Sequence, residues 1–410
     1  MERNWAGNVE YRAATIDRPT TIGELRDMVA RSPRVHVLGS RHSFNAIADA
    51  EHLISLDAIP DDVIVDVDGE SVELNPAMTY GRLAPMLHER ELALHNLASL
   101  PHISIGGAIA TGTHGSGDRL GNLATAVRAL DILRSDGSIV RLERGDADFD
   151  GAVVALGALG VVVRVRLDVE PEYQIAQRVY EGLGWDALAA NFDEITGAGD
   201  SVSMFTTWGP HVDQVWVKQR PPCDPVATFF GARPATVDLH PIAGVSAKNC
   251  TPQLGVPAPW SDRLPHFKTG FTPSSGDELQ SELLLPRGSA LDAIEIVRGL
   301  SGDMAPHLLV SEIRTVAADP LWMSPQFERQ TVAFHFTWQP HIAEVARLVI
   351  GLEGALAAFD PRPHWGKVFD VDGPTLAERY PRHSDFVDLI ERFDRRGAFR
   401  TTWLERHVLT

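Results

Sequence analysis

Residues 96–117 constrain the fold of this chain more than any other stretch. The segment reads Asn-Leu-Ala-Ser-Leu-Pro-His-Ile-Ser-Ile-Gly-Gly-Ala-Ile-Ala-Thr-Gly-Thr-His-Gly-Ser-Gly, so its 22 residues hold five glycines and five hydroxyl side chains. Residues this small fill a core poorly, but glycine lets the backbone approach a ligand closely, and hydroxyls hydrogen-bond to phosphate or carbonyl oxygens. We interpret the segment as a cofactor cradle; a plain series of glycine turns is the alternative.

A second small-residue loop follows a predicted strand near the N-terminus. The strand, at 35–38, runs into Gly39-Ser-Arg-His-Ser43. Successive backbone N–H groups in such a loop can point at a pyrophosphate. The spacing matches neither G-x-x-x-x-G-K-[ST] nor G-x-G-x-x-G, so the P-loop and Rossmann interpretations fail. Taken alone, the segment is more often an ordinary strand-to-loop turn with a surface histidine.

Length, charge and cysteine content limit the class of protein. With 410 residues the chain exceeds one ordinary core, so we expect two domains. A net charge of −18 would repel the phosphates of nucleic acid, so no nucleic-acid partner is expected. Cys223 and Cys250 form no C-x-x-C pair or zinc motif, and no metal site is expected. No secretory signal or membrane-length apolar run is visible, which favours a cytoplasmic protein without a membrane partner. We also expect a monomer.

The local patterns indicate an α+β fold. Residues 20–32 predict a helix with Thr21 as N-cap and Glu24 completing a capping box. Strands are predicted at 63–67 and 71–74, and a helix over 79–92. The region from about 171 to 361 is less regular and richer in Pro, Trp and Phe. Helices are predicted again from Leu376 and around 386–393.

The clearest strands in that second region are predicted at 278–284, 311–316 and 331–338. Each alternates polar and apolar residues, as strands with two different faces do. Glu312 and Arg314 share one face, His335 and Thr337 share another, and Gln280 lies between two glutamates on a third. Burying such faces is costly unless something polar lies on them. A solvent-exposed sheet with a structural Glu-x-Arg ion pair is the commoner alternative.

Five motifs occur in a specific order along the chain: Gly39-Ser-x-His42-Ser-Phe44, Ser99-Leu-Pro-His-Ile-Ser104, Gly112-Thr-His-Gly115, Leu159-Gly-Val161 and His364-Trp-Gly-Lys367. The ordered set resembles the vanillyl-alcohol-oxidase family of flavoproteins, within it the aldonolactone-oxidase branch, and there most closely the bacterial alditol (xylitol) oxidases. The likeness covers nearly the whole chain, including Phe-Thr-Pro-Ser-Ser at 271–275.

The resemblance implies a PCMH-type FAD-binding domain made of residues 1–172 and 363–410. Residues 173–362 would form a substrate domain with a mixed or antiparallel sheet flanked by helices. FAD would be attached covalently through His42, and only once, because no cysteine lies in the flavin-binding half. Relatives usually carry Gly before that histidine, so Arg41 must tolerate whatever φ the Gly allowed. The implied cofactor contacts besides His42 are Leu38, Gly39, Ser40, Arg41, Ser43, Ser99, Ser104, Gly107, Ala108, Ile109, Ala110, Thr111, Val162 and His364.

The same resemblance implies oxidation of the C1 primary hydroxyl of polyols such as xylitol and sorbitol to the aldose. Hydride would pass to flavin N5, and O2 would be reduced to hydrogen peroxide. Arg314 and Lys367 would be catalytic, because fixed positive charges stabilise a developing alkoxide. The implied substrate-binding residues are Ser99, Gln280, Glu312, Arg314, His335, Thr337 and Lys367.

Two other functions stay open. The first is an aldonolactone (gulono-, galactono- or arabinono-lactone) oxidase or dehydrogenase of the same branch. The second is a flavin-binding protein without turnover, which the polar strand faces disfavour. Reactivity with oxygen is also open, because Ala98 lies next to Ser99 and is implied to lie close to the flavin.

Overall fold

The structure is a computed structural model that describes residues 2–66, 69–223, 226–271 and 278–409. The strands are β1 (Ile16–Asp17), β2 (His36–Val37), β3 (Leu53–Ile54), β4 (Ile64–Val65), β5 (Ser71–Leu74), β6 (Leu92–Ala93), β7 (Val127–Leu133), β8 (Ile139–Glu143), β9 (Val161–Asp168), β10 (Glu170–Pro171), β11 (Gln174–Gly184), β12 (Ser201–Thr206), β13 (His211–Gln219), β14 (Arg233–Pro234), β15 (Ala258–Pro259), β16 (Leu279–Pro286), β17 (Leu308–Val316), β18 (Thr331–Trp338) and β19 (Arg362–Pro363). The α-helices are α1 (Ile22–Arg31), α2 (Tyr80–His88), α3 (Ile105–Ala110), α4 (Phe149–Val153), α5 (Trp185–Ala190), α6 (Phe192–Thr196), α7 (Ala290–Gly299), α8 (Ser301–Met304), α9 (Ile342–Ala355), α10 (Gly373–Arg379), α11 (His383–Phe393) and α12 (Thr402–His407).

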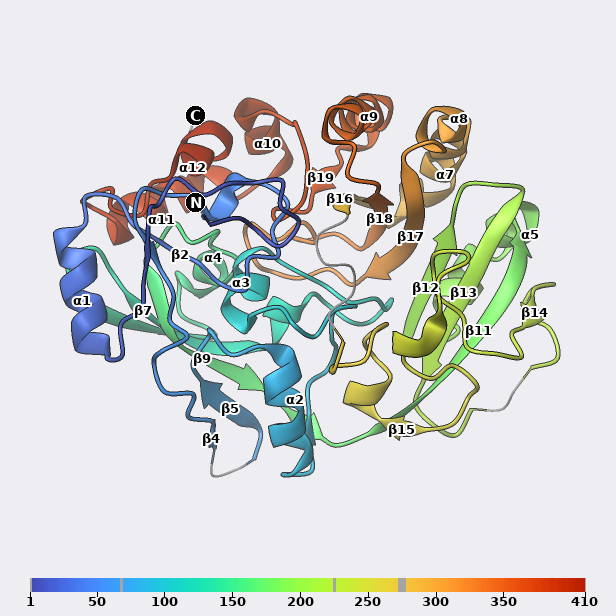
Figure 1. Cartoon of the computed structure of the whole chain (residues 1–410), viewed down its shortest axis with the longest axis horizontal. Coiled ribbons are helices and arrows are strands. Elements are labelled where there is room, and N and C mark those ends of the chain that lie inside the picture. Colours follow the sequence, from blue (N-terminus) through green and yellow to red (C-terminus); the bar gives the residue numbers. More distant parts are fainter. Residues whose placement is uncertain (1, 67–68, 224–225, 272–277, 410) are drawn as a thin grey trace.

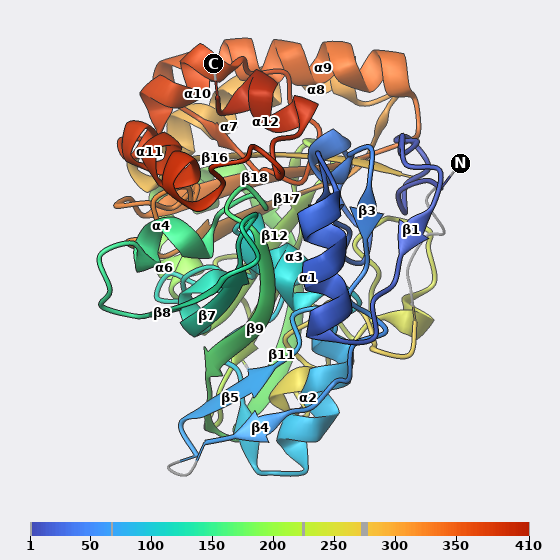
Figure 2. The ribbon, with the colours of Figure 1, turned by 90° about the vertical axis from the view of Figure 1, so that its left-hand side faces the viewer.

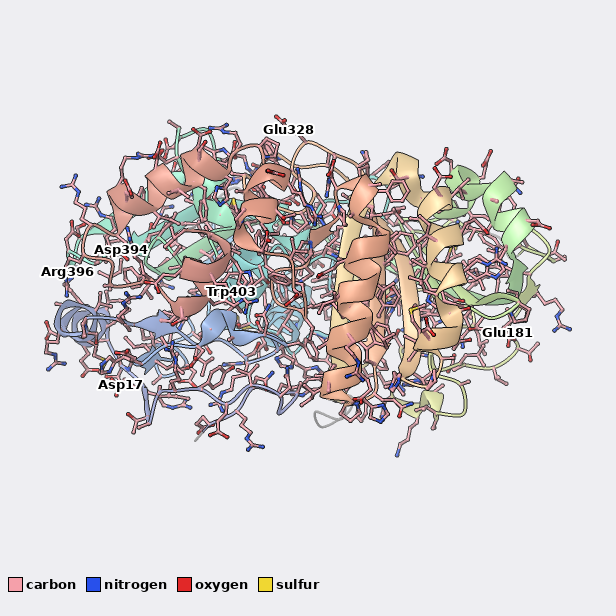
Figure 3. The ribbon with its side chains drawn as sticks, turned by 90° about the horizontal axis from the view of Figure 1, so that it is seen from above. Asp17, Glu181, Glu328, Asp394, Arg396 and Trp403 are labelled. Atoms are coloured by element: carbon pink, nitrogen blue, oxygen red, sulfur yellow. The ribbon has the colours of Figure 1, made fainter. Side chains whose placement is uncertain are left out.

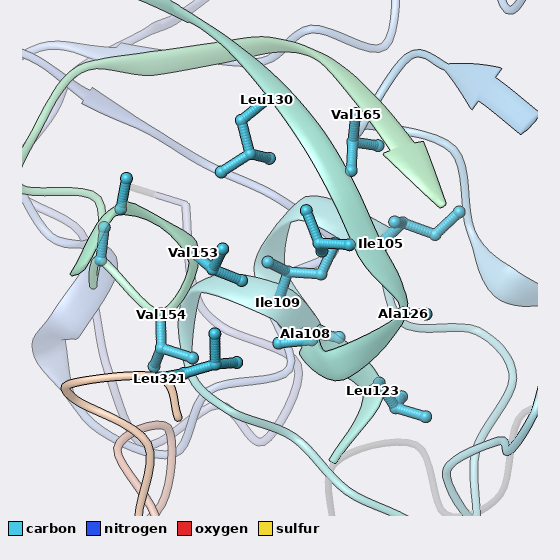
Figure 4. Packing of buried hydrophobic residues seen from close by; sticks show 14 of the residues in the cluster. Ile105, Ala108, Ile109, Leu123, Ala126, Leu130, Val153, Val154, Val165 and Leu321 are labelled. Carbon is cyan, nitrogen blue, oxygen red and sulfur yellow. The ribbon is translucent and has the colours of Figure 1, made fainter. Parts of the chain in front are cut away.

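The N-terminal region is built on a small parallel sheet, β1-β3-β2, and an antiparallel sheet, β4-β5-β9-β7-β8. Strand β9 alternates strictly, with buried residues at every second position, as a strand with one core face does. Figure 4 shows that α3 directs Ile105 and Ile109 toward Leu130 of β7 and Val165 of β9. The glycine-rich segment therefore rests on a firm apolar core.

A large antiparallel sheet forms the other part of the molecule, in the order β14-β11-β13-β12-β17-β18-β16-β19 (Figure 1). Helices α7 and α9 lie side by side over one face, as the view from above shows (Figure 3). Phe334, Phe336 and Trp338 of β18 are fully buried in the core that these helices share. The opposite face of β18, which carries His335 and Thr337, is thereby turned toward the N-terminal region. The α+β fold with a helix-flanked sheet, expected from the sequence, is confirmed.

The chain returns to its own beginning after β19. The backbone N–H of Phe44 donates to the carbonyl of Gly366 at 2.7 Å, and Asn45 Nδ2 donates to the carbonyls of Trp365 (2.8 Å) and Lys367 (2.7 Å). Helices α10, α11 and α12 then pack beside the N-terminal sheets (Figure 2), and α11 and α12 contribute to the same apolar core as α3. Two segments more than 300 residues apart in sequence are thus joined.

Most predicted elements occur, with shifted ends. Thr21 caps α1 by accepting from the Glu24 N–H, but the Glu24 carboxylate accepts from Thr20 rather than from the cap residue. Helix α2 ends at His88 instead of reaching 92, because Glu91 adopts a left-handed φ of 56° and β6 begins next. Residue 67 of one predicted strand and residues 272–275 of one motif lie outside the described residues. Within the described ranges, no helix has the length and apolar character to span a membrane.

Candidate functional site

A cavity of about 650 Å³ lies between the N-terminal loops and the large sheet. This is a usual size for a small-molecule site. We call its first side the loop wall, formed by residues 38–44 and 98–114 with Val162. The second side is the sheet wall, formed by the inward side chains of β16, β17 and β18 with His364 and Lys367.

The loop wall is held together by two serines. Ser104 N donates to Ser40 Oγ at 2.9 Å, and Ser40 N donates to Ser104 Oγ at 3.3 Å. A Cβ at Gly39 would stand 2.5 Å from Ser104 Oγ, closer than van der Waals contact permits. Gly39 is therefore needed for the close approach of two loops, which leaves their backbone facing the cavity.

His42 is the unsatisfied group of the loop wall. Both of its ring nitrogens are buried, and neither reaches a hydrogen-bond partner in good geometry among the described residues. Its ring stacks on Trp5 with centroids 5.4 Å apart. Burial lowers the pKa of His42 to about 4, so the imidazole is neutral and keeps a free lone pair at neutral pH. Orphaned buried polar atoms are rare and call for a partner.

Arg41 adopts the left-handed backbone conformation that its position requires. Its φ is 64°, in the left-handed region where glycine is at ease and other residues are strained. Its guanidinium forms an ion pair with Glu2, and its carbonyl accepts from the Trp5 N–H at 2.9 Å. These N-terminal contacts hold a residue that the local conformation disfavours.

The sheet wall owes its polarity to strand register. Glu282 of β16 and Glu312 of β17 both pair with His335, which stands between them on β18. Because paired residues in antiparallel strands point to the same face, the three side chains form a row across the sheet. All three are at least nine-tenths buried.

Glu282 connects the two cations that were predicted from the sequence. Its Oε1 accepts from Arg314 Nη2 at 2.8 Å, and its Oε2 accepts from Lys367 Nζ at 2.6 Å. Burial alone would raise the pKa of Glu282, but Lys367, His114 and Arg314 hold it well below its ordinary value. The sequence had suggested Glu312 as the local partner of Arg314; that carboxylate lies farther away, 3.6 Å from Arg314 Nε. Glu282 was noticed only as a neighbour of Gln280, because Lys367 is 85 residues away along the chain.

His335 has a tautomer set by its neighbours. Lys367 Nζ lies 2.7 Å from His335 Nδ1, and His335 Nε2 lies 3.1 Å from Thr337 Oγ1. An ammonium can only donate, so Nδ1 accepts and Nε2 carries the proton that it donates to Thr337. Burial, aided by Lys367, lowers the pKa of His335 to about 3, which keeps the ring neutral. The Thr337 hydroxyl proton is then left to donate into the cavity.

A second arrangement of the same kind was not predicted from the sequence. Lys218 Nζ lies 3.1 Å from His266 Nδ1, and His266 Nε2 lies 2.9 Å from Glu312 Oε1. Burial raises the pKa of Glu312, but Arg314 and His266 lower it more, so this pKa lies below its ordinary value. His266 lines the cavity, and its backbone N–H donates to the Ser99 carbonyl at 3.2 Å.

The structure brings nearly all predicted site residues to one cavity. Its lining includes Leu38, Gly39, Ser40, Arg41, His42, Ser43, Ala98, Ser99, Ser104, Gly107, Ala108, Ala110, Thr111, Val162, Gln280, Glu312, Arg314, His335, Thr337, His364 and Lys367. Ile109 instead points into the apolar core behind α3 (Figure 4), because a helical residue cannot share the face of its neighbour. Gln280 Nε2 donates to Glu278 at 2.7 Å.

Comparison with known proteins identifies the family. A family model described as an FAD binding domain matches residues 13–143, and one described as D-arabinono-1,4-lactone oxidase matches residues 280–407. An alditol oxidase from Streptomyces sp. (strain IKD472 / FERM P-14339) is 48% identical over 98% of this chain and 97% of its own length. This chain belongs to the alditol oxidase family.

This member of the alditol oxidase family also matches more distant proteins over nearly its whole length. L-gulonolactone oxidase from Mus musculus is 25% identical over 98% of this chain and 97% of its own. L-gulono-1,4-lactone dehydrogenase from Mycobacterium tuberculosis (strain ATCC 25618 / H37Rv) is 27% identical over 98% of both. The crystal structure of cholesterol oxidase from B. sterolicum superposes with a TM-score of 0.79 at 13% identity, over 98% of this chain and 95% of that one. The vanillyl-alcohol-oxidase type of fold is confirmed.

The residues of the loop wall fit the FAD of the alditol oxidase family. Gly39 leaves room where a Cβ would collide, and the two serine-locked loops expose backbone to the cavity. His42 offers two buried ring nitrogens without a partner among the described residues. Leu38 to Ser43, Ser104 and Gly107 would hold the cofactor there, with His364 facing it from the sheet wall.

Proposed function

We propose that this protein is an FAD-dependent alditol oxidase that oxidises the C1 primary hydroxyl of polyols such as xylitol and sorbitol to the aldose. Its flavin is attached covalently through His42, and oxygen is reduced to hydrogen peroxide. The observation that carries the proposal is the sheet wall, a row of buried, mutually bonded polar side chains facing the cavity that the cofactor loops enclose. A face this polar needs a polar ligand.

The sheet wall offers complementary groups to a chain of hydroxyls. Glu312 Oε1 accepts from His266, whereas Oε2 has only Arg314 Nε nearby, at 3.6 Å, among the described residues. Oε2 can therefore accept a hydrogen bond from a substrate hydroxyl. Thr337 can donate, and Ser99 can do either. Each hydroxyl of a polyol both donates and accepts, so binding several of them orients C1. An apolar alcohol would leave these groups unpaired and be rejected.

Arg314 and Lys367 are placed to stabilise the alkoxide that forms at O1. Arg314 Nε is buried and makes no hydrogen bond to any described residue. Lys367 spends two of its three donors on Glu282 and His335, which leaves one for a substrate oxygen. Preorganised donors aimed at developing charge are usually the largest contribution to such a rate. FAD, when bound, would supply the hydride acceptor and would pass the two electrons on to oxygen, giving hydrogen peroxide.

The test is a peroxide-coupled panel on purified holoenzyme, with xylitol and sorbitol against gulono-, galactono- and arabinono-lactone. The lactones represent the second candidate, which the lactone-oxidase model over residues 280–407 favours. Faster turnover of the polyols supports our proposal, and faster turnover of a lactone replaces it. If no substrate gives peroxide, anaerobic xylitol should still bleach the flavin of a dehydrogenase. Flavin that stays oxidised would identify a binding protein without turnover.

Covalent attachment has a separate test. After acid precipitation and denaturation, flavin fluorescence should stay on the wild-type chain and be lost from His42→Ala. The imidazole of His42 is neutral and has no hydrogen-bond partner among the described residues, which supports this assignment. Flavin that is released fully from the wild type would show the cofactor to be bound non-covalently.

We keep the division into an FAD-binding domain (1–172 and 363–410) and a substrate domain (173–362) as a proposal. The bonds from Phe44 and Asn45 to residues 365–367 support it. In a chain nicked near residues 172 and 363, the C-terminal fragment should stay with the flavin-bearing N-terminal fragment; if it stays with residues 173–362 instead, the division is wrong.

A further inference from the structure

Lys218 is a buried cation outside the cavity. It lies on β13, its exposed fraction is 1%, and it does not line the cavity, whereas its neighbour His266 does. Nζ donates to the Leu264 carbonyl and to His266 Nδ1, and no described carboxylate lies within ion-pair distance of it. Burying an ammonium without a carboxylate is costly. Among the described residues, the hydrogen bonds of Lys218 reach the cavity through His266.

The order of donors along this route follows from the protonated form of Lys218. A lysine ammonium cannot accept, so His266 Nδ1 must be the acceptor. The pKa of His266 is lowered to about 4, first by burial and then by Lys218, so the ring is neutral and its single proton lies on Nε2. Nε2 therefore donates to Glu312 Oε1 at 2.9 Å. The other tautomer would turn a lone pair toward the carboxylate and push it away.

The arrangement repeats that of Lys367, His335 and Thr337 on the same wall. In both, a lysine donates to Nδ1 of a neutral histidine whose Nε2 donates to a cavity-lining oxygen. In the first arrangement the lysine itself reaches the cavity, and in the second it stays behind it. The hydrogen bonds of Lys218 thus lead to Glu312, the cavity-lining end of this arrangement.

We propose that Lys218 and His266 are positioning residues that fix Glu312 as an oriented, ionised acceptor for a polyol hydroxyl. We call the hydrogen-bonded series Lys218–His266–Glu312 the relay. The inference rests on the proposed function for the identity of the ligand, but the relay itself is a property of the chain. Nothing in it touches the reacting C1 or O1. We expect it to govern binding and to leave the chemical step nearly unchanged.

The relay also predicts a pH dependence of binding. Lys218 is faced by His266, by Glu312 and Arg314 of β17, and by Cys250. Burial, together with Arg314, lowers the pKa of Lys218 to about 7, and Glu312 opposes the shift. Above that pH the neutral amine donates more weakly to His266 Nδ1 than the ammonium does, so Nε2–H becomes a weaker donor to Glu312 and holds it less firmly. Xylitol binding to the wild type should weaken as the pH rises from 6 to 8.5. The same binding to Lys218→Met should be weak and flat.

Anaerobic stopped-flow reduction of the holoenzyme over a xylitol series tests the proposal. Lys218→Met and His266→Leu should raise the dissociation constant about 10- to 100-fold, as loss of a charged hydrogen bond does. The limiting rate should change by less than about threefold, as for loss of ground-state binding. His266→Gln, whose amide accepts from Lys218 and donates to Glu312, should restore most of the binding. Lys268→Met, at an exposed lysine two residues from His266, is the matched control.

A double-mutant cycle separates positioning from folding. In a Glu312→Gln background, Lys218→Met should weaken binding by less than about twofold, because coupled residues are not additive. Full additivity, or a His266→Gln variant as weak as His266→Leu, would overturn the relay.

Imidazole ¹⁵N NMR tests the relay without any substrate, with the His266 signal assigned by its loss in His266→Gln. At pH 6 the wild type should show a neutral ring protonated at Nε2, with an Nδ1 signal shifted by the hydrogen bond from Lys218, and Lys218→Met should lose that Nδ1 shift while Glu312 keeps the proton on Nε2. A wild-type ring protonated at Nδ1, or at both nitrogens, contradicts the proposal even if xylitol proves to be a substrate. The predicted tautomer in an enzyme that ignores polyols leaves the relay intact and refutes the proposed function instead.

Discussion

The two walls of the cavity differ in their side chains and in how their polar groups are satisfied. The loop wall is made of backbone and very small side chains, held by the Ser40–Ser104 bonds, and it leaves His42 without a hydrogen-bond partner among the described residues. The sheet wall is made of charged side chains that already neutralise one another through Glu282. The difference indicates that the loop wall needs a bound group to satisfy its polar atoms. The sheet wall satisfies most of its own polar groups and leaves a few, such as the buried Arg314 Nε, for a ligand.

The strongest way to break this comparison is to remove the centre of the sheet wall. Glu282→Ala should lower the free energy of unfolding by about 3–5 kcal/mol, because Arg314 and Lys367 would remain buried without their carboxylate. Urea denaturation followed by fluorescence measures it. Glu344→Ala, which breaks the exposed pair with Arg347, is the control and should have little effect. Equal small losses would mean that the buried pairs are not mutually supporting.

The second prediction sharpens the role of the spare donors. Arg314→Ala and Lys367→Ala should slow anaerobic flavin reduction at saturating xylitol by roughly 10²–10³, the usual loss on removing an oxyanion donor. Stopped-flow bleaching separates rate from binding directly. If the dissociation constant weakens while the limiting rate stays unchanged, the two cations only bind ground-state hydroxyls.

The third prediction concerns the loop wall. Gly39→Ala should force Ser104 aside and cost about 1–3 kcal/mol, as overpacking does. The ratio of flavin to protein absorbance should fall with it. Gly23→Ala, in the exposed first turn of α1 with an ordinary 3.7 Å contact, is the matched control and should keep its flavin. Normal flavin content in Gly39→Ala would show that the cradle tolerates a side chain.

The smallest predicted effect is a pH dependence at His36 of β2, which lines the cavity next to the loop wall. Burial lowers the pKa of His36 to about 4, so the folded protein binds fewer protons than the unfolded chain between pH 4 and 6.5. Stability from this group is present above about 6.5 and is lost as the pH falls. Down to pH 5 the loss is about 2 kcal/mol. Denaturation curves at pH 7 and pH 5 should therefore give a smaller difference in the free energy of unfolding for His36→Leu than for the wild type. An unchanged difference would mean that His36 is already charged in the fold.

Local patterns predicted much of this protein. The capping residue Thr21, the alternation of β18 at 331–338 and the two small-residue loops were readable because each depends on neighbours within a few residues. The ordered motifs placed the chain among flavoproteins before any contact was known. The Arg41 conformation was also foreseeable, since one residue stood where a glycine is usual.

Tertiary structure alone decided how the charges pair. Glu282 meets Lys367 85 residues later, and Glu312 meets His266 46 residues earlier. Strand register and the return of the chain after β19 bring these groups together, and neither leaves a periodic signal in the sequence. Burial then determined what the pairs mean. The same Glu-x-Arg pattern on an exposed sheet would be a weak ion pair, whereas here low solvent access makes every unpaired donor and acceptor costly and therefore available to a ligand.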